Sequence, residues 1–421
     1  MTHSPSLMDK IKAPFKESKM LTMLILGYAS GFPLMLTASS LFIWYKDNGI
    51  ETKDIGFLTI ISIPYTFKYL WAPFLDKIKI PILGRRKGWI FITQLLLVIL
   101  IILMSRLSPA NYPFIIAFIG FLICFTSATQ DIAINAYQTE ILLERERALG
   151  NSIAVMGYRV GMLVTGSLVL IIVDKLNNNW NSALLMLIPF FIICPIYTLF
   201  IKDSQYQETP KSFKDAFVQP FVEFFQRQGS YTAIIIITII ISYKLSDAIA
   251  FSLNSIFFID IGFSKTTIAV SYKTLSLFAS LAGLVAGGVV AKKIGIYKSF
   301  ASFSFLMAFA NLTYVLLAIT GKNYYLMLAS VIVEYFCGAM GTAILVALIM
   351  SLVNVKFSAT QFAILTSIDS LSRVFVGPLA GYIQFHFKWE GLFLFSFIVG
   401  IAISTLILIC KQRIKTMANL E

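Results

Sequence analysis

The chain has 421 residues, of which 58% are hydrophobic and only 13% are charged, and its formal net charge at pH 7 is +13. This composition excludes an ordinary soluble globular protein, and long apolar runs between short charged loops predict an all-α polytopic membrane protein. The two histidines, His3 and His386, and the four cysteines lack the spacing of metal ligands or of a catalytic triad. We therefore expect no metal, no cofactor and no enzyme activity.

Taken in chain order, the apolar segments predict about twelve membrane-spanning helices. They lie near 21–43, 55–75, 89–106, 113–137, 149–173, 182–201, 231–257, 267–290, 297–319, 324–353, 360–384 and 390–410. The longest interior loop divides them into an N-terminal six-helix half, 1–201, and a C-terminal half, 231–421. Two six-helix halves joined by a linker are the layout of the major facilitator fold.

Basic residues gather in alternate loops, which predicts the orientation of the chain. One side collects, among others, Lys10, Lys12, Lys77, Arg85, Arg86, Lys87, Lys202, Lys292, Lys293, Lys411 and Arg413. The positive-inside rule places this side, and with it both termini, in the cytoplasm. The excess positive charge is thus an orientation signal, and we expect no nucleic-acid partner.

The linker at 202–230 contains four phenylalanines at three- and four-residue spacing: Phe213, Phe217, Phe221 and Phe224. Charged residues lie between them, so the pattern predicts an amphipathic helix on the membrane surface. A flexible linker is the alternative, because Pro210 and Pro220 weaken a helix.

The segment 113–137 carries Gln130 and Asp131 after a long apolar run. A carboxylate at hydrocarbon depth costs roughly 2.5–3.5 kcal/mol on insertion scales, so it is a functional candidate. The polar face of this helix must contact protein or water rather than lipid. The alternative is that Asp131 lies where the helix emerges at the membrane surface.

Other charged residues also fall inside predicted helices. The basic ones are Lys68, Arg159, Lys244, Lys273 and Arg373, and the acidic ones are Asp131, Asp247, Glu334 and Asp369. Lys244 and Asp247 are three residues apart, and Asp369 and Arg373 are four apart, so each pair can form an ion pair on one helix face. Glu334, Lys68 and Lys273 have no partner close in sequence, which favours function. Arg159 could meet a helix terminus or Asp131 from the neighbouring helix.

These charges suit coupled transport of an anion. Asp131, Asp247, Glu334 and Asp369 are the candidates for binding and releasing a proton, because a buried carboxylate near a cation can do both. The candidate substrate-binding residues add amide and aromatic groups to the cations: Tyr28, Tyr65, Lys68, Gln130, Arg159, Lys244, Lys273 and Arg373. Arginine grips a carboxylate with two hydrogen bonds, and lysine acts as a point charge.

The loop after the second predicted helix holds Asp76, Arg85 and Arg86. Charges here can bridge helix ends between the halves and act as a gate, although a plain positive-inside anchor is the alternative.

Glycines four residues apart mark three predicted helices. The pairs are Gly27 with Gly31, Gly157 with Gly161, and Gly283 with Gly287. Small residues at this spacing predict close helix packing.

Motifs in both halves carry a family resemblance. The N-terminal ones are LGYASGFPLMLT at 26–37, IGFLTIISIPYTFKYLWAPFLD at 55–76, GRRKGW at 84–89, SATQDIAINAY at 127–137 and GYRVGMLVTG at 157–166. The C-terminal ones are YKLSDAIAFSL at 243–253, CGAMGTAILVALIM at 337–350, FSATQFAIL at 357–365 and SRVFVGPLAGY at 372–382. On these motifs the chain resembles the AmpG-type muropeptide permeases, bacterial members of the major facilitator superfamily.

This resemblance implies proton-coupled import of N-acetylglucosaminyl-anhydromuramyl peptides across the inner membrane, for peptidoglycan recycling. In some bacteria such import feeds β-lactamase induction. The implied partners are the anhydromuropeptide, protons and the lipid bilayer, with the chain acting as a monomer. The alternative is transport of another anionic solute, such as an acyl-CoA-type compound or a peptide. A membrane enzyme and a non-transporting sensor are further alternatives, but no nucleophile constellation favours the former.

Overall fold

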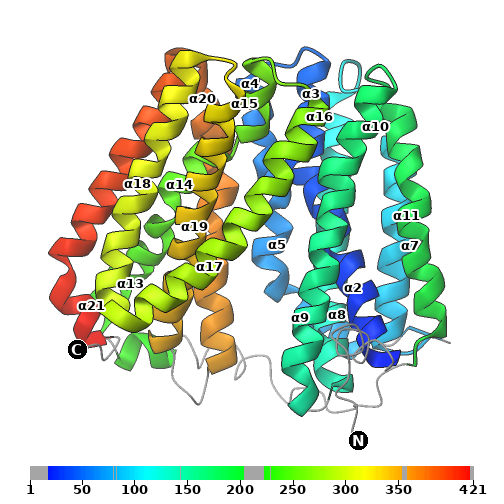
Figure 1. Ribbon diagram of the computed structural model, residues 1–421. Coiled ribbons are helices and arrows are strands. Elements are labelled where there is room, and N and C mark those ends of the chain that lie inside the picture. Colours follow the sequence, from blue (N-terminus) through cyan, green and yellow to red (C-terminus); the bar gives the residue numbers. More distant parts are fainter. Residues whose placement is uncertain are drawn as a thin grey trace, which may run out of the picture. The chain divides into compact units, whose positions relative to one another are not determined.

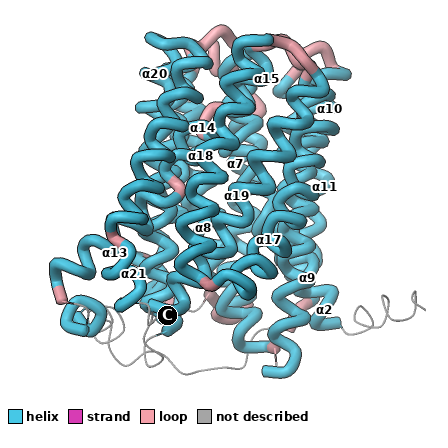
Figure 2. Tube along the Cα trace, turned by 60° about the vertical axis from the view of Figure 1, so that its left-hand side comes forward, coloured by secondary structure: helices cyan, strands magenta, loops and turns pink. Residues whose placement is uncertain are grey.

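The computed structural model describes residues 18–417 except 79, 82, 143, 203–221, 228 and 353–357. Helices make up nearly all of this part of the chain (Figures 1 and 2). Its β-structure, within the same residues, is the isolated bridge between Ile80 and Gly84. The chain divides into two compact units, of which the first comprises Met1–Asn48 and Phe67–Thr209 and the second Gly49–Thr66 and Pro210–Glu421.

The first unit is built from helices that follow the predicted segments closely. They are α2 (Ser18–Met35), α3 (Leu41–Asp47), α6 (Ala72–Lys77), α7 (Arg86–Met104), α8 (Pro113–Ile141), α9 (Glu144–Leu163), α10 (Val169–Lys175) and α11 (Trp180–Phe200). A π-helical turn, Leu36–Ser40, joins α2 to α3, and another, Val164–Leu168, joins α9 to α10. A π-helical turn of this kind continues the helix and rotates the side chains that follow it about the helix axis.

The second unit contains α4 (Thr52–Gly56), most of α5 (Ile63–Phe67) and the helices after the linker. The latter are α13 (Ser230–Tyr243), α14 (Leu245–Phe251), α15 (Asn254–Asp260), α16 (Lys265–Thr267), α17 (Thr274–Ile294), α18 (Ile296–Thr320), α19 (Tyr324–Leu352), α20 (Ser358–Ile409) and α21 (Lys411–Met417). α20 contains a kink at Lys388, where φ is 59° and ψ is −170°, and therefore joins two of the predicted helices.

Ten helical spans among the described residues are long and apolar enough to cross a membrane. The predicted twelve differ from these ten at two places. α20 contains two predicted spans, and the predicted helix 55–75 is a series of short α and 3₁₀ helices from Thr52 to Lys77. Pro64 and Pro73 lie in that series, and each removes a backbone N–H from the helical ladder. The all-α polytopic fold is thus confirmed.

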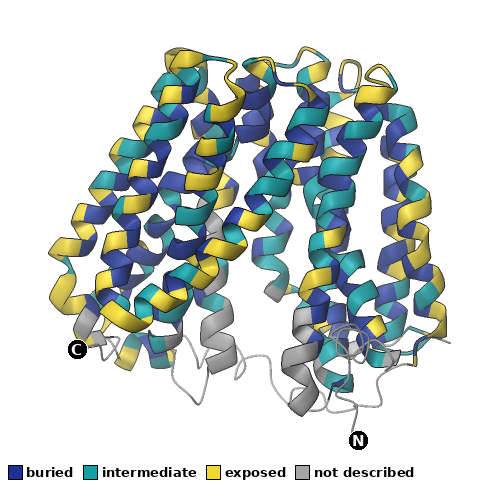
Figure 3. Cartoon of the chain, viewed as in Figure 1, coloured by how far each residue is buried: buried dark blue, intermediate teal, exposed yellow. Residues whose placement is uncertain are grey.

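Exposed apolar side chains recur along the helices, which suits a lipid surrounding (Figure 3). Phe114, Phe200 and Ile409 are examples, with relative exposures of 87%, 80% and 76%. Such side chains would be costly in water, and hydrocarbon is a neutral environment for them.

The predicted glycine pairs lie where helices come closest. A Cβ atom built on Gly31 would lie 2.0 Å from the carbonyl oxygen of Tyr158, and one on Gly157 would lie 2.0 Å from that of Leu24. In the second unit, a Cβ atom on Gly283 would lie 2.2 Å from the carbonyl oxygen of Phe336. The close packing of α2 on α9 and of α17 on α19 is therefore confirmed at these glycines.

Most of the predicted linker helix, including Phe213, Phe217 and Phe221, lies outside the described residues. Residues 222–227 are helical, and Phe224 is buried in the apolar core of the second unit. Arg227 binds Glu223 at 2.9 Å and donates to the carbonyl oxygen of Leu352 at 2.7 Å. This end of the linker is therefore anchored in the second unit.

Candidate functional site

In the first unit, Asp131 on α8 lies at the centre of a polar cluster. Lys68 forms an ion pair with it, with 3.8 Å between Nζ and Oδ2, and the hydroxyl of Ser30 on α2 donates to Oδ1. The Asp131 side chain is 14% exposed and that of Lys68 is 35% exposed. Lys68 has no partner close in sequence, and the fold supplies Asp131 as its partner from a distant helix.

The turn of α8 that ends at Asp131 carries further polar groups. Thr129 accepts a hydrogen bond from the indole N–H of Trp71 at 3.1 Å. The amide of Gln130 and the hydroxyl of Ser127 are fully buried and have no hydrogen-bond partner among the described residues. Buried polar groups are nearly always hydrogen-bonded, so these atoms are available to a ligand or to water.

Two further candidates of the first unit, Tyr28 and Arg159, lie on α2 and α9. Tyr28 donates to the carbonyl oxygen of Phe190 at 2.9 Å and packs edge-on against Phe32. Arg159 is half-buried on α9, and the ion pair of Asp131 is formed with Lys68 instead. Tyr65, which is half-buried, belongs to the second unit.

The predicted gating loop is held by an ion-pair cluster inside the first unit. Arg86 donates to Glu140 on α8 from Nε at 2.9 Å and from Nη2 at 2.8 Å, and Arg85 binds the same oxygen at 3.2 Å. Glu140 was not among the predicted site residues. Its place just after the predicted helix 113–137, on the side where the basic residues gather, was the available signal.

The side chain of Asp76, the third predicted gating residue, lies outside the described residues. Whether this loop acts as a gate stays a prediction.

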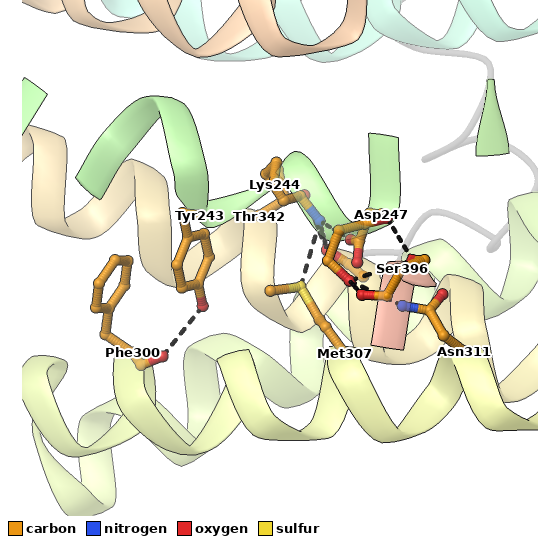
Figure 4. Close-up of polar contacts among 10 residues, drawn as sticks. Tyr243, Lys244, Asp247, Phe300, Met307, Asn311, Thr342 and Ser396 are labelled. Atoms are coloured by element: carbon orange, nitrogen blue, oxygen red, sulfur yellow. Dashed lines mark hydrogen bonds and ion pairs between the residues drawn. The ribbon is translucent and has the colours of Figure 1, made fainter. Parts of the chain in front are cut away.

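In the second unit, Lys244 and Asp247 form the ion pair that their spacing predicts. The ammonium nitrogen of Lys244 lies 2.7 Å from Oδ2 of Asp247 and donates to the carbonyl oxygen of Gly338 on α19, also at 2.7 Å. Sδ of Met307 lies 3.5 Å from the same nitrogen (Figure 4). Both charged side chains are about nine-tenths buried, with 10% and 8% exposure.

The helix is interrupted at this pair. The predicted helix 231–257 is interrupted at Lys244, where φ is −98° and ψ is 4°, so that α13 ends at Tyr243 and α14 begins at Leu245. The segment has neither glycine nor proline at this position, so its sequence carried no sign of a break. The predicted span is confirmed over Ser230–Asp260, but it is interrupted here and again between α14 and α15.

A hydroxyl and amide network lies next to the pair and was missed by the sequence analysis. Ser246 donates to the carbonyl oxygen of Ser396 at 2.9 Å and accepts from the amide of Asn311 at 2.9 Å (Figure 4). All three side chains are buried. An amide inside the apolar segment 297–319 was the available signal for Asn311.

Glu334 on α19 is fully buried, and neither carboxyl oxygen has a hydrogen-bond partner among the described residues. It precedes Gly338 by four residues, so the two lie on the same helix face, one turn apart. The fold thus brings Glu334 into electrostatic interaction with Lys244 and Asp247.

Lys273 lies among hydroxyl and aromatic groups of the second unit. Its ammonium nitrogen is 3.4 Å from the hydroxyl oxygen of Ser255 and 4.9 Å from the ring centre of Tyr272. The hydroxyl groups of Tyr272 and Tyr335 are hydrogen-bonded at 2.7 Å. These contacts give Lys273 a polar surrounding that its sequence position did not reveal.

The predicted ion pair of Asp369 and Arg373 stays a prediction, because the side chain of Asp369 lies outside the described residues. Arg373 is exposed on α20.

We expect Asp247→Ala to lower the free energy of unfolding by about 3–5 kcal/mol, because it leaves the buried ammonium of Lys244 without its counter-charge. Denaturation of the purified protein in detergent measures this loss. The double variant Lys244→Met/Asp247→Ala should recover a large part of it, since it buries no unpaired charge. Equal losses in the single and double variants would contradict this account.

The comparisons with known proteins agree with this architecture. The sequence model of the Major Facilitator Superfamily matches residues 20–332. The chain therefore belongs to the Major Facilitator Superfamily, a class of membrane transporters. The resemblance to its AmpG-type permeases is confirmed by two relatives.

The anhydromuropeptide permease of Escherichia coli (strain K12) is 38% identical over 403 residues, which cover 95% of this chain and 81% of that protein. The putative transporter AmpG 4 of Rickettsia felis is 30% identical, over 95% of this chain and 98% of that protein.

Solved structures show the same fold at low sequence identity. A POT family transporter in complex with 5-aminolevulinic acid has a TM-score of 0.73 at 12% identity. The match covers 94% of this chain and 96% of the POT transporter chain. A D-xylose–proton symporter has a TM-score of 0.70 at 12% identity. The match covers 92% of this chain and 96% of the symporter chain.

Proposed function

We propose that this transporter imports anhydromuropeptides together with protons across the bacterial cytoplasmic membrane, as a monomer with both termini in the cytoplasm. The observation that carries the proposal is the 38% identity, over 95% of the chain, to the anhydromuropeptide permease of Escherichia coli. The distribution of basic residues among the loops supports the orientation.

The chemistry of the two units supports a carboxylate-bearing substrate. Lys68 in the first unit is a half-buried cation paired with Asp131. Lys273 in the second unit is a half-buried cation beside the hydroxyl of Ser255 and the ring of Tyr272. Gln130 offers buried amide atoms that have no partner among the described residues. A ligand with sugar hydroxyls, amides and several carboxylates can use all of these groups.

Proton coupling is supported by acidic groups at membrane depth. Asp131 lies beside Lys68, and Asp247 and Glu334 lie near Lys244. A carboxyl group between a low-dielectric surrounding and a cation can be driven either to bind or to release a proton when the cavity opens.

Uptake of a radiolabelled anhydromuropeptide by cells that lack their own permease, with and without this protein, tests the proposal. We expect the protein to restore uptake, and a collapse of the proton gradient to abolish accumulation. A protein that reaches the membrane without restoring uptake would contradict the substrate assignment. Inhibition of uptake by an acyl-CoA compound or a peptide, rather than by unlabelled anhydromuropeptide, would favour the alternative substrates.

A further inference from the structure

Glu334 differs from the other described candidate carboxylates in its hydrogen bonding. Asp131 accepts a hydrogen bond from Ser30 and pairs with Lys68, and Asp247 pairs with Lys244. Glu334 is fully buried and, among the described residues, has no hydrogen-bond partner at either oxygen. An ionised carboxylate in such a place is costly, whereas a carboxylic acid is tolerated much better.

The ammonium group of Lys244 lies close enough to stabilise the ionised form of Glu334. Lys244 donates to the carbonyl oxygen of Gly338, one helical turn from Glu334 along α19. One turn is about 5.4 Å, and the flexible stem of a lysine can move its ammonium group over such a distance. Gly338 has no side chain between these groups, and a Cβ atom there would contact both Oδ2 of Asp247, at 3.4 Å, and the Lys244 nitrogen, at 3.7 Å.

Among the described residues, Lys244 is the cation that interacts with Glu334. The charged and titratable groups that interact with it electrostatically are Lys244, Asp247, Tyr314, Tyr335 and Cys337. α17, which packs closely on α19, has no titratable residue between Thr274 and Ala291. Lys273, just before α17, is held beside Ser255 and Tyr272.

We infer that Glu334 carries the co-transported proton and that Lys244 neutralises its carboxylate after the proton leaves. The inference rests on the proposed function. Glu334 takes up one proton from water on the outer side and releases it to water on the cytoplasmic side, and no covalent bond of the substrate changes. When the proton leaves, Lys244 is shared between Asp247 and Glu334, so that both carboxylates keep a cation beside them. Lys244 is also the residue at which α13 ends and α14 begins, so the proton acts at the break between these helices.

Proteoliposomes separate proton coupling from translocation. We expect Glu334→Gln to lose the gradient-driven accumulation of radiolabelled anhydromuropeptide and to retain exchange of labelled for unlabelled substrate without a gradient. Glu390→Gln, the same chemical change at a half-buried position on α20, is the matched control and should retain both. Accumulation in Glu334→Gln equal to that of the wild type, or loss of exchange in the folded variant, would overturn the inference.

The pH dependence of exchange provides a second measurement. Exchange by the wild type should fall at alkaline pH, and exchange by Glu334→Gln should not depend on pH. In Lys244→Gln the fall should move to higher pH, because no cation stabilises the carboxylate. If Glu334→Gln does not fold, Glu334→Asp should keep coupled uptake with a shifted pH profile, and an unshifted profile would count against the inference.

A measurement without substrate keeps this inference distinct from the proposed function. Infrared difference spectra of the purified protein between acidic and alkaline pH should contain a protonated-carboxyl C=O band that is absent in Glu334→Gln. Its presence in both proteins would remove Glu334 as the proton carrier. A wild type that shows the band but fails to take up anhydromuropeptide would contradict only the substrate assignment.

Discussion

Asp131→Asn should lose most anhydromuropeptide uptake while the protein still reaches the membrane in normal amount. The substitution removes the charge that pairs with Lys68 and that accepts the hydrogen bond of Ser30, but it keeps the size of the side chain. Because Lys68 is 35% exposed, we expect the loss of stability to be small, on the order of 1 kcal/mol.

Uptake at several pH values, normalised to the amount of protein in the membrane, measures this effect. Asp174→Asn is the matched control, since Asp174 undergoes the same chemical change at an exposed position on α10. Normal uptake by Asp131→Asn across the pH range would exclude Asp131 from the transport cycle.

Gly283→Ala should destabilise the second unit strongly. The added Cβ atom would lie 2.2 Å from the backbone oxygen of Phe336, so α17 and α19 must move apart. Over-packing of this kind typically costs about 1–3 kcal/mol and occasionally more, and a backbone obstacle places this variant at the upper end.

Gly288 on the same helix provides the control. A Cβ atom there would meet nothing within 4 Å, so Gly288→Ala should leave the melting temperature unchanged or raise it, because alanine favours the helix by about 0.5–1 kcal/mol. Thermal unfolding in detergent compares the two variants. Equal melting temperatures of Gly283→Ala and Gly288→Ala would show that α17 and α19 accommodate the added methyl group without loss of stability.

The composition and hydropathy of the sequence determined the membrane class, the all-helical fold and nearly every span. Local spacing also determined the Lys244–Asp247 pair and the glycine faces on which helices pack closely, because residues three or four apart on a helix share a face. These features depend on helical geometry alone, whereas the helix that packs on each glycine face is decided by the tertiary structure.

Only the tertiary structure decided the partners that come from distant helices. Asp131 meets Lys68, Arg86 meets Glu140, and Asn311 meets Ser246, and each pair is more than 50 residues apart. Periodicity shows which face of a helix is polar, but it does not show which helix lies opposite.

The backbone break at Lys244 was equally hidden from the sequence. It occurs without glycine or proline, at the residue whose side chain reaches both Asp247 and the backbone of α19. Because one of those two partners lies on a helix far along the chain, only the packed structure could reveal where the helix is interrupted.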